Sequence, residues 1–109
     1  MAENVPTLLI RVKLFGHLKQ ISQQQDIDCE VQAGSTVYNL IQNLSDRLGN
    51  DFHRAVLDSR GNLQGGIEIV LDQQHLPARK IAAIPLLEDC EVFILPMIEG
   101  GGIPANIVN

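Results

Sequence analysis

The chain has 109 residues, which fits one domain, and 45% of them are hydrophobic, enough for a modest core at this size. Thirteen Asp and Glu residues against eight Lys and Arg residues give a net charge of −5. This balance argues against a nucleic-acid-binding protein, whose footprint is a basic patch. It suits a basic protein partner, and it is also an ordinary means of keeping a protein soluble.

The N-terminal residues lead into a first predicted strand. They lack the basic and apolar regions of a signal peptide, and the chain nowhere approaches the roughly 18 apolar residues of a membrane-spanning helix, so we expect a cytoplasmic protein without membrane contact. Residues 7–15 then alternate between apolar and polar positions, as a half-buried strand does. Residues 27–31 alternate in the same way. Arg11 and Lys13 could pair with Asp28 and Glu30 across an antiparallel hairpin.

The clearest predicted helix covers residues 37–48. Apolar side chains recur there at helical spacing, and polar side chains fall on the other side. Ser35 or Thr36 can cap its N-terminus, although no Glu or Gln stands three residues later to complete a capping box, and Gly49 suits its C-terminal end. The predicted core stripe consists of Val37, Leu40, Ile41, Leu44 and Leu48.

The second half of the chain is predicted to add mainly strands. Residues 55–58 are typical of a short strand, residues 67–71 of a main strand followed by a turn at 72–74, and residues 78–84 of one or two helical turns that Pro85 ends. The last strand covers residues 90–95. One amphipathic helix packed across one face of a small mixed sheet would bury all these apolar stripes, which predicts an α+β architecture.

The cysteines and histidines give no sign of a metal or catalytic site. Cys29 and Cys90 fall on apolar strand faces without a Cys-x-x-Cys pair, so core packing is favoured over a disulfide and over redox or metal roles. His17, His53 and His75 lie in unrelated contexts without metal-ligand spacing. We interpret them as ordinary surface or turn histidines and expect no metal site.

The most informative segment follows the last strand and reads Pro96-Met-Ile-Glu-Gly-Gly-Gly102. Glycine suits a tail that threads a narrow site, because it has no Cβ and accepts almost any φ and ψ. Residues 103–109 come after it and would stand in the way of a reactive glycine terminus. A flexible tail without function is the alternative interpretation of these glycines.

The element order, with the glycine tail at its end, resembles the ubiquitin-like β-grasp fold, and within it the MoaD/ThiS sulfur-carrier family, which includes the small subunit of molybdopterin synthase. Four stretches carry the resemblance, at residues 12–19, 34–41 and 65–71, and at 86–92 with the tail. The resemblance implies a mixed sheet of four to five strands with one main helix across one face. It also implies a β-grasp domain over residues 1–102 and a C-terminal extension over 103–109 that processing could remove.

In this family an E1-like adenylyltransferase uses ATP and Mg to adenylate a terminal glycine carboxylate, which then becomes a thiocarboxylate that donates sulfur. The resemblance therefore implies a sulfur carrier, not an enzyme by itself, whose reactive end is Gly101 or Gly102, with Gly100 in the tail. The carrier binds no cofactor of its own. Implied partners are the E1-like enzyme, the molybdopterin synthase large subunit or another sulfur acceptor enzyme, and a processing peptidase. Molybdenum cofactor synthesis is favoured over thiamin synthesis and other sulfur transfer.

The last strand also predicts a docking surface. If the helix covers one sheet face, Val70, Phe93 and Leu95 lie on the other, and Pro96 follows them. An exposed apolar patch with a polar rim commonly marks an interaction site. Burial beneath residues 72–85 is the alternative for these side chains. A non-carrier β-grasp interaction or assembly module is the alternative function.

Overall fold

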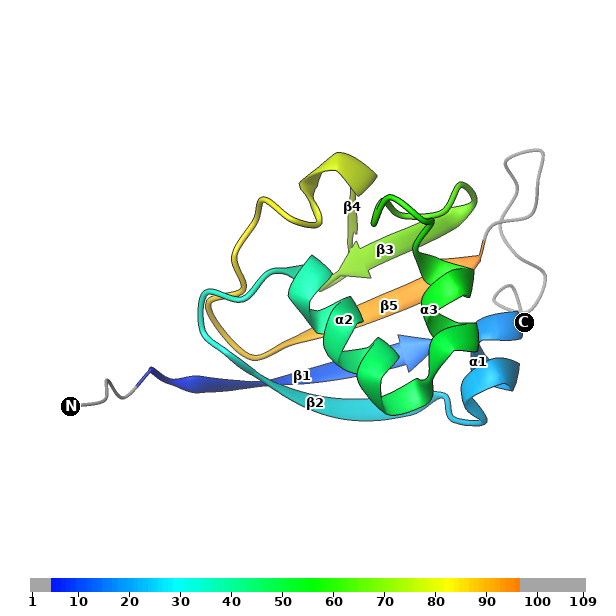
Figure 1. Ribbon diagram of the computed structural model, residues 1–109. Helices are drawn as coiled ribbons and strands as arrows, with labels where there is room; N and C mark the ends of the chain where they lie inside the picture. Colours follow the sequence, from blue (N-terminus) through cyan, green and yellow to red (C-terminus); the bar gives the residue numbers. More distant parts are fainter. Residues whose placement is uncertain (1–4, 97–109) are drawn as a thin grey trace.

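The computed structural model describes residues 5–96, which form one mixed sheet with helices packed on one of its faces (Figure 1). The order across the sheet is β2-β1-β5-β3-β4, and the two central strands, β1 and β5, are parallel while every other pair is antiparallel. The predicted α+β sheet with one main helix is confirmed. In chain order the elements are β1 (Thr7–Leu14), α1 (His17–Ser22), β2 (Asp26–Gln32), α2 (Val37–Leu48), α3 (Asn50–Val56), β3 (Ile67–Leu71), β4 (Gln74–Leu76), the 3-10 helix η1 (Ala78–Lys80) and β5 (Cys90–Pro96).

The β1–β2 hairpin forms as predicted, with a register that changes one of the expected ion pairs. Arg11 lies opposite Asp28 and pairs with it at 3.5 Å. Lys13 lies opposite Asp26, not Glu30, and pairs with it at 3.6 Å. The connection between the strands contains the short helix α1, because the apolar Leu18 turns into the core and is fully buried.

Helix α2 has the bounds that the sequence predicts, Val37–Leu48. Its N-terminus carries a complete capping box, which corrects the expectation of an incomplete one. Asn39 takes the place of the usual Glu or Gln: its side chain accepts a hydrogen bond from the Thr36 backbone N–H, and the Thr36 hydroxyl accepts one from the Asn39 N–H. The stripe formed by Val37, Leu40, Ile41 and Leu44 is fully buried, and Leu48 is half-buried.

The short strand predicted at residues 55–58 is wrong. Residues 50–56 form helix α3, and only Leu57 makes an isolated bridge, to Leu63. The physical reason is the spacing of Phe52 and Val56, which lie one helical turn apart and are both fully buried. Helix α3 packs beside α2 and touches α1, so the helical layer is broader than a single helix (Figure 1).

Strand β4 was not predicted, although the turn before it was. Leu71 pairs with Gln74, which leaves Asp72 and Gln73 as a two-residue hairpin loop, and both have positive φ, at 48° and 71°. This is the type I′ geometry that matches the twist of a hairpin, here built without glycine. Asp72 also anchors the turn to β5: its N–H donates to the Glu91 carbonyl and its carboxylate accepts from the Glu91 N–H.

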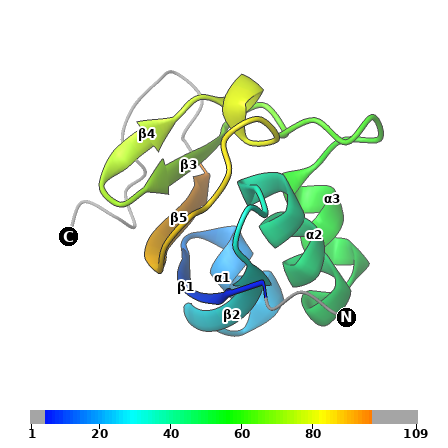
Figure 2. The same ribbon diagram turned by 90° about the vertical axis from the view of Figure 1, so that its left-hand side faces the viewer.

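The core lies between the helical layer and one face of the sheet, and the other face is left without helices (Figure 2). The segment after β4 joins the helical side. Its Ile81 carbonyl accepts from the Tyr38 N–H at 2.9 Å, and its Leu86 N–H donates to the Ser35 carbonyl at 2.7 Å. Residues 77–87 therefore lie against the start of α2 and do not cover the open face of the sheet.

Candidate functional site

The predicted reactive glycines, Gly100, Gly101 and Gly102, lie outside the described residues, as does the extension 103–109. The structure does describe Pro96, the residue after which the segment with these glycines begins. Strand β5 is a central strand of the sheet and ends at Pro96, which pairs with Ile67 at the beginning of β3. The segment that carries the glycines thus starts from one end of a strand that is paired on both sides.

Three of the four predicted docking residues, Val70, Phe93 and Leu95, share the open face of the sheet, whereas Pro96 pairs with the buried Ile67 and alternates to the helical face. Phe93 in β5 lies directly between Lys13 in β1 and Val70 in β3, and the Phe15 ring lies beside it with the centroids 5.4 Å apart. Phe93, Val70 and Pro96 are half-buried. The open-face patch consists of Phe15, Val70, Phe93 and Leu95.

Leu95 differs from the expectation of an exposed side chain, since only 8% of it is accessible. It stands in the central strand directly opposite Glu68, and Glu68 is joined to His75 of β4. The patch is bordered by this pair on one side and by the pairs Lys13–Asp26 and Arg11–Asp28 on the other. It is therefore a half-buried apolar strip with a charged rim, in which Phe93 and Val70 offer more surface than Leu95 does.

The two cysteines are free thiols, and the sheet register keeps them apart. Cys29 in β2 and Cys90 in β5 lie opposite the same residue, Ile10 in β1, from its two sides. Two strand spacings of about 4.8 Å each separate them, which exceeds the reach of a disulfide. Cys29 is buried, with Arg47 Nη1 at 3.3 Å from its sulfur, and burial raises the pKa of its thiol.

We expect Cys90 to be a poor nucleophile. Burial, together with the negative charges of Asp72, Asp89 and Glu88, raises the pKa of its thiol to about 11. Because only the thiolate reacts and each pKa unit changes its population tenfold, the reactive fraction at pH 8 should be about 100-fold below that of an ordinary cysteine. Iodoacetamide labelling of the folded chain, read for each cysteine by peptide mass, should be slow and should accelerate as the pH rises toward 11. The chain unfolded in guanidinium chloride is the control, and equal labelling rates in both states would contradict the expectation.

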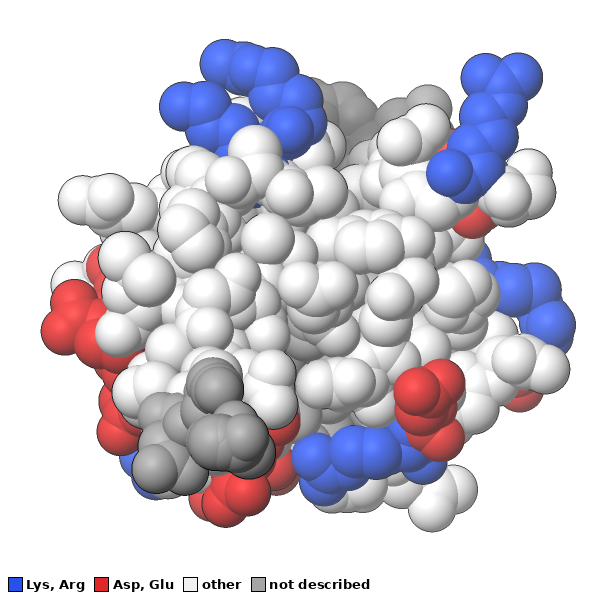
Figure 3. All heavy atoms as spheres, turned by 60° about the vertical axis from the view of Figure 1, so that its left-hand side comes forward, with Lys and Arg blue, Asp and Glu red and all other residues white. Residues whose placement is uncertain are grey.

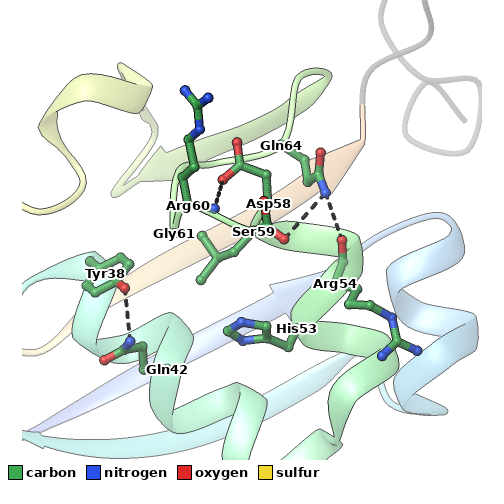
Figure 4. Close-up of a pocket in the computed structure, with 10 residues that line it drawn as sticks. Tyr38, Gln42, His53, Arg54, Asp58, Ser59, Arg60, Gly61 and Gln64 are labelled. Carbon is green, nitrogen blue, oxygen red and sulfur yellow. Dashed lines mark hydrogen bonds between the residues drawn. The ribbon is translucent and has the colours of Figure 1, made fainter.

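A surface hollow on the helical side was not anticipated from the sequence (Figure 4). It has a volume of about 520 Å³ and lies between α2, α3 and the segment after α3. Tyr38 accepts a hydrogen bond from Gln42, and Gln64 donates to the Arg54 carbonyl. Its lining residues are Tyr38, Gln42, His53, Arg54, Leu57, Asp58, Ser59, Arg60, Gly61 and Gln64.

The predicted surface histidines have separate environments. His53 lines the hollow, and its Nδ1 lies 3.0 Å from the Ser45 hydroxyl. Since that hydroxyl donates to the Ile41 carbonyl, His53 Nδ1 is the donor in this contact. His75 lies on β4 beside Glu68, and His17 is exposed on α1. Within residues 5–96 no three His, Cys, Asp or Glu side chains gather as metal ligands, and no helix is long and apolar enough to cross a membrane.

Comparison with known proteins decides the family. The sequence profile of the ThiS family matches residues 12–101, most of the chain. The chain belongs to the ThiS family. The match covers β1 to β5 and continues into the glycine tail, where it ends at Gly101. No curated protein matches this ThiS-family chain by sequence.

Solved structures confirm the ubiquitin-like β-grasp fold of this ThiS-family chain. SAMP1 from Haloferax volcanii superposes with a TM-score of 0.73 at 17% identity, over 85% of this chain and 99% of that one. Urm1 from Trypanosoma brucei gives 0.69 at 16% identity, over 93% and 100%. A protein from Pyrococcus furiosus described as a putative molybdopterin converting factor, subunit 1, gives 0.66 at 17%, over 84% and 99%. At sequence identities this low, the superpositions establish that the fold is shared and nothing more.

Proposed function

We propose that this protein is a sulfur carrier whose glycine carboxylate, at Gly101, is activated by an E1-like adenylyltransferase and converted to a thiocarboxylate. The observation that carries the proposal is the extent of the family match, which includes the tail and ends at Gly101. This favours Gly101 over Gly102 as the working terminus. The destination we propose for the sulfur is molybdopterin, as in the family's molybdopterin synthase small subunits, with thiamin or another acceptor as the alternative.

The fold suits this role because the carrier needs no catalytic group of its own. A carboxylate is a poor electrophile until one of its oxygens belongs to a good leaving group. In the proposed reaction that oxygen attacks the α-phosphate of ATP and pyrophosphate leaves. Hydrosulfide from the sulfur donor then displaces AMP from the acyl carbon, and loss of its proton leaves the thiocarboxylate. The E1-like partner supplies the ATP, the magnesium and the catalytic groups. The carrier supplies a thin acyl end, for which glycine is suited because a Cβ would crowd a site shaped around backbone.

The open-face patch is the surface that we assign to partners of the carrier. Phe93 and Val70 are partly accessible and stand in or beside the strand from which the tail continues. An enzyme that encloses the tail therefore meets this apolar strip and its charged rim first. The same patch supports the alternative function, a β-grasp interaction or assembly module that does not carry sulfur.

The proposal is tested by mass spectrometry on a chain that ends at Gly101. We expect this form, incubated with the E1-like enzyme of its own host, ATP, Mg²⁺ and a sulfur donor, to gain the mass difference between one sulfur and one oxygen atom. The same mixture without ATP is the control, because activation needs the adenylate. An unchanged mass with ATP present, for this chain and for one that ends at Gly102, would favour the interaction module.

A further inference from the structure

A second hollow of about 440 Å³ adjoins the one in Figure 4 and extends it toward η1. The two share the lining residues Tyr38, Arg60 and Gly61, so they adjoin on the helical side of the molecule. Gly61 has φ of 83°, and a Cβ at this position would come to 3.2 Å from the Tyr38 hydroxyl. A side chain at this position would therefore crowd the Tyr38 hydroxyl, which lines both hollows. We name the two adjoining hollows together the arginine groove, after Arg60 and Arg79, which line it.

The charge of the arginine groove is opposite to that of the chain. Arg60 and Arg79 line the half next to η1, which no carboxylate lines, and Lys80 follows Arg79 in η1. Among residues 5–96 neither arginine takes part in an ion pair. Arg54 lines the other half and pairs with Asp51. Four of the chain's eight Lys and Arg residues therefore line the groove or follow directly after a residue that lines it, in a protein of net charge −5. Figure 3 shows Lys and Arg side chains at the upper left and upper right of the view and others at its right and lower edges, with Asp and Glu side chains mainly at the left and lower edges.

The one acidic side chain in the groove already has hydrogen-bond partners. Asp58 Oδ1 accepts from the backbone N–H groups of Arg60 and Asn62, at 2.9 and 3.0 Å, which shapes the loop. The Tyr38 hydroxyl accepts from Gln42 Nε2 at 3.0 Å, so its own proton is available to a ligand. Two guanidinium groups and a hydroxyl donor are groups that recognise carboxylates.

The groove also lies close to the start of the tail. Gln64 lines its end near β3, and the Gln64 carbonyl accepts from the Ile67 N–H at 3.1 Å. Ile67 pairs with Pro96, from which the glycine segment continues. A protein that encloses the tail therefore meets the Gln64 end of the groove, and the basic half beside η1 lies at the other end.

We propose that the arginine groove binds an acidic segment of the enzyme that activates the carrier, an inference that rests on the proposed function. A short acidic segment of a protein can contact the basic groove without reaching the acidic surface around it. A nucleic acid carries a charge about every 1.7 Å along its axis and would extend from the groove over the acidic remainder of the surface. The charge pattern therefore favours a protein segment over a polynucleotide.

The test compares two full-length double variants that lose the same positive charge. Arg60→Gln with Arg79→Gln neutralises the groove, and Lys19→Gln with Arg47→Gln neutralises exposed residues of α1 and α2 that do not line it. We expect the groove variant to bind the host E1-like enzyme about tenfold more weakly than the control variant at low salt, with the difference shrinking at high salt. Circular dichroism verifies that both variants are folded.

Dissociation constants for the two variants within about twofold of each other would overturn the inference. It is also overturned if the wild-type chain does not bind the enzyme, or if a DNA oligonucleotide competes with the enzyme for the groove. These outcomes are separate from failure of the proposed function, which appears as an unchanged mass of both the Gly101-ended and the Gly102-ended chains. If the Gly101-ended chain gains sulfur while the two variants bind the enzyme equally well, the carrier proposal is supported and the groove proposal is wrong.

Discussion

Leu40→Ala should lower the free energy of unfolding by about 2–5 kcal/mol, the usual cost of truncating a fully buried leucine. Leu40 lies at the centre of the α2 stripe and is completely inaccessible, as are Val37, Ile41 and Leu44. The truncation removes apolar contacts with the core and leaves a cavity that a close-packed interior cannot fully close. For a domain of this size such a loss is a large share of the total stability.

Urea denaturation followed by circular dichroism measures the effect. Asn43→Ala is the matched control, because Asn43 lies in the same helix but is exposed, so its change should stay within about 0.5 kcal/mol. A Leu40→Ala variant as stable as this control would mean that the stripe does not face the core.

The parts of the fold that the sequence predicted are those with a long, strong pattern. Helix α2 shows four buried apolar residues at helical spacing over twelve residues, and strands β1 and β2 alternate over their full lengths. Periodicity of this kind reports directly which face of an element is buried. The predicted bounds of α2 therefore match the structure.

The parts that the sequence did not predict are short or depend on tertiary contacts. Helix α3 has only Phe52 and Val56 to mark its buried side, and a seven-residue helix is not stable by itself. Strand β4 has three residues, and its turn uses Asp72 and Gln73 where glycine would have signalled a hairpin. Asn39 completes the capping box with an amide in place of the expected Glu or Gln.

Of the two candidate sites, one could be predicted from the sequence and the other could not. The open-face patch follows from alternation within single strands, so Val70 and Phe93 could be placed on one face from the sequence alone. The arginine groove could not, because Tyr38, Arg60 and Arg79 come from three separate segments that only the fold brings together. The burial of Leu95 likewise depends on its neighbours across the sheet, and strand alternation does not report it.

The position of the terminus should decide whether the carrier reacts at all. We expect thiocarboxylate on the chain that ends at Gly101, little or none on chains that end at Gly100 or Gly102, and none on the chain that ends at Asn109. The last of these presents the carboxylate of an asparagine that lies beyond Pro104, so a peptidase must act on it first. We expect the reaction to depend this strongly on the last residue because displacing a reacting group by about 1 Å can lower the rate about 100-fold.

Gly101→Ala, made in the chain that ends at this residue, isolates the effect of the side chain from that of length. It should slow thiocarboxylate formation by about 10- to 100-fold, since a methyl group obstructs the close backbone approach that glycine permits. Intact mass recorded over time gives the rate, and Asn43→Ala in the same truncated chain controls for handling. Equal rates for all four termini would remove Gly101 as the reactive end, and reaction of the Asn109-ended chain without a peptidase would show that no trimming is required. If only the Gly102-ended chain gains sulfur, the carrier assignment stands with its reactive residue moved by one.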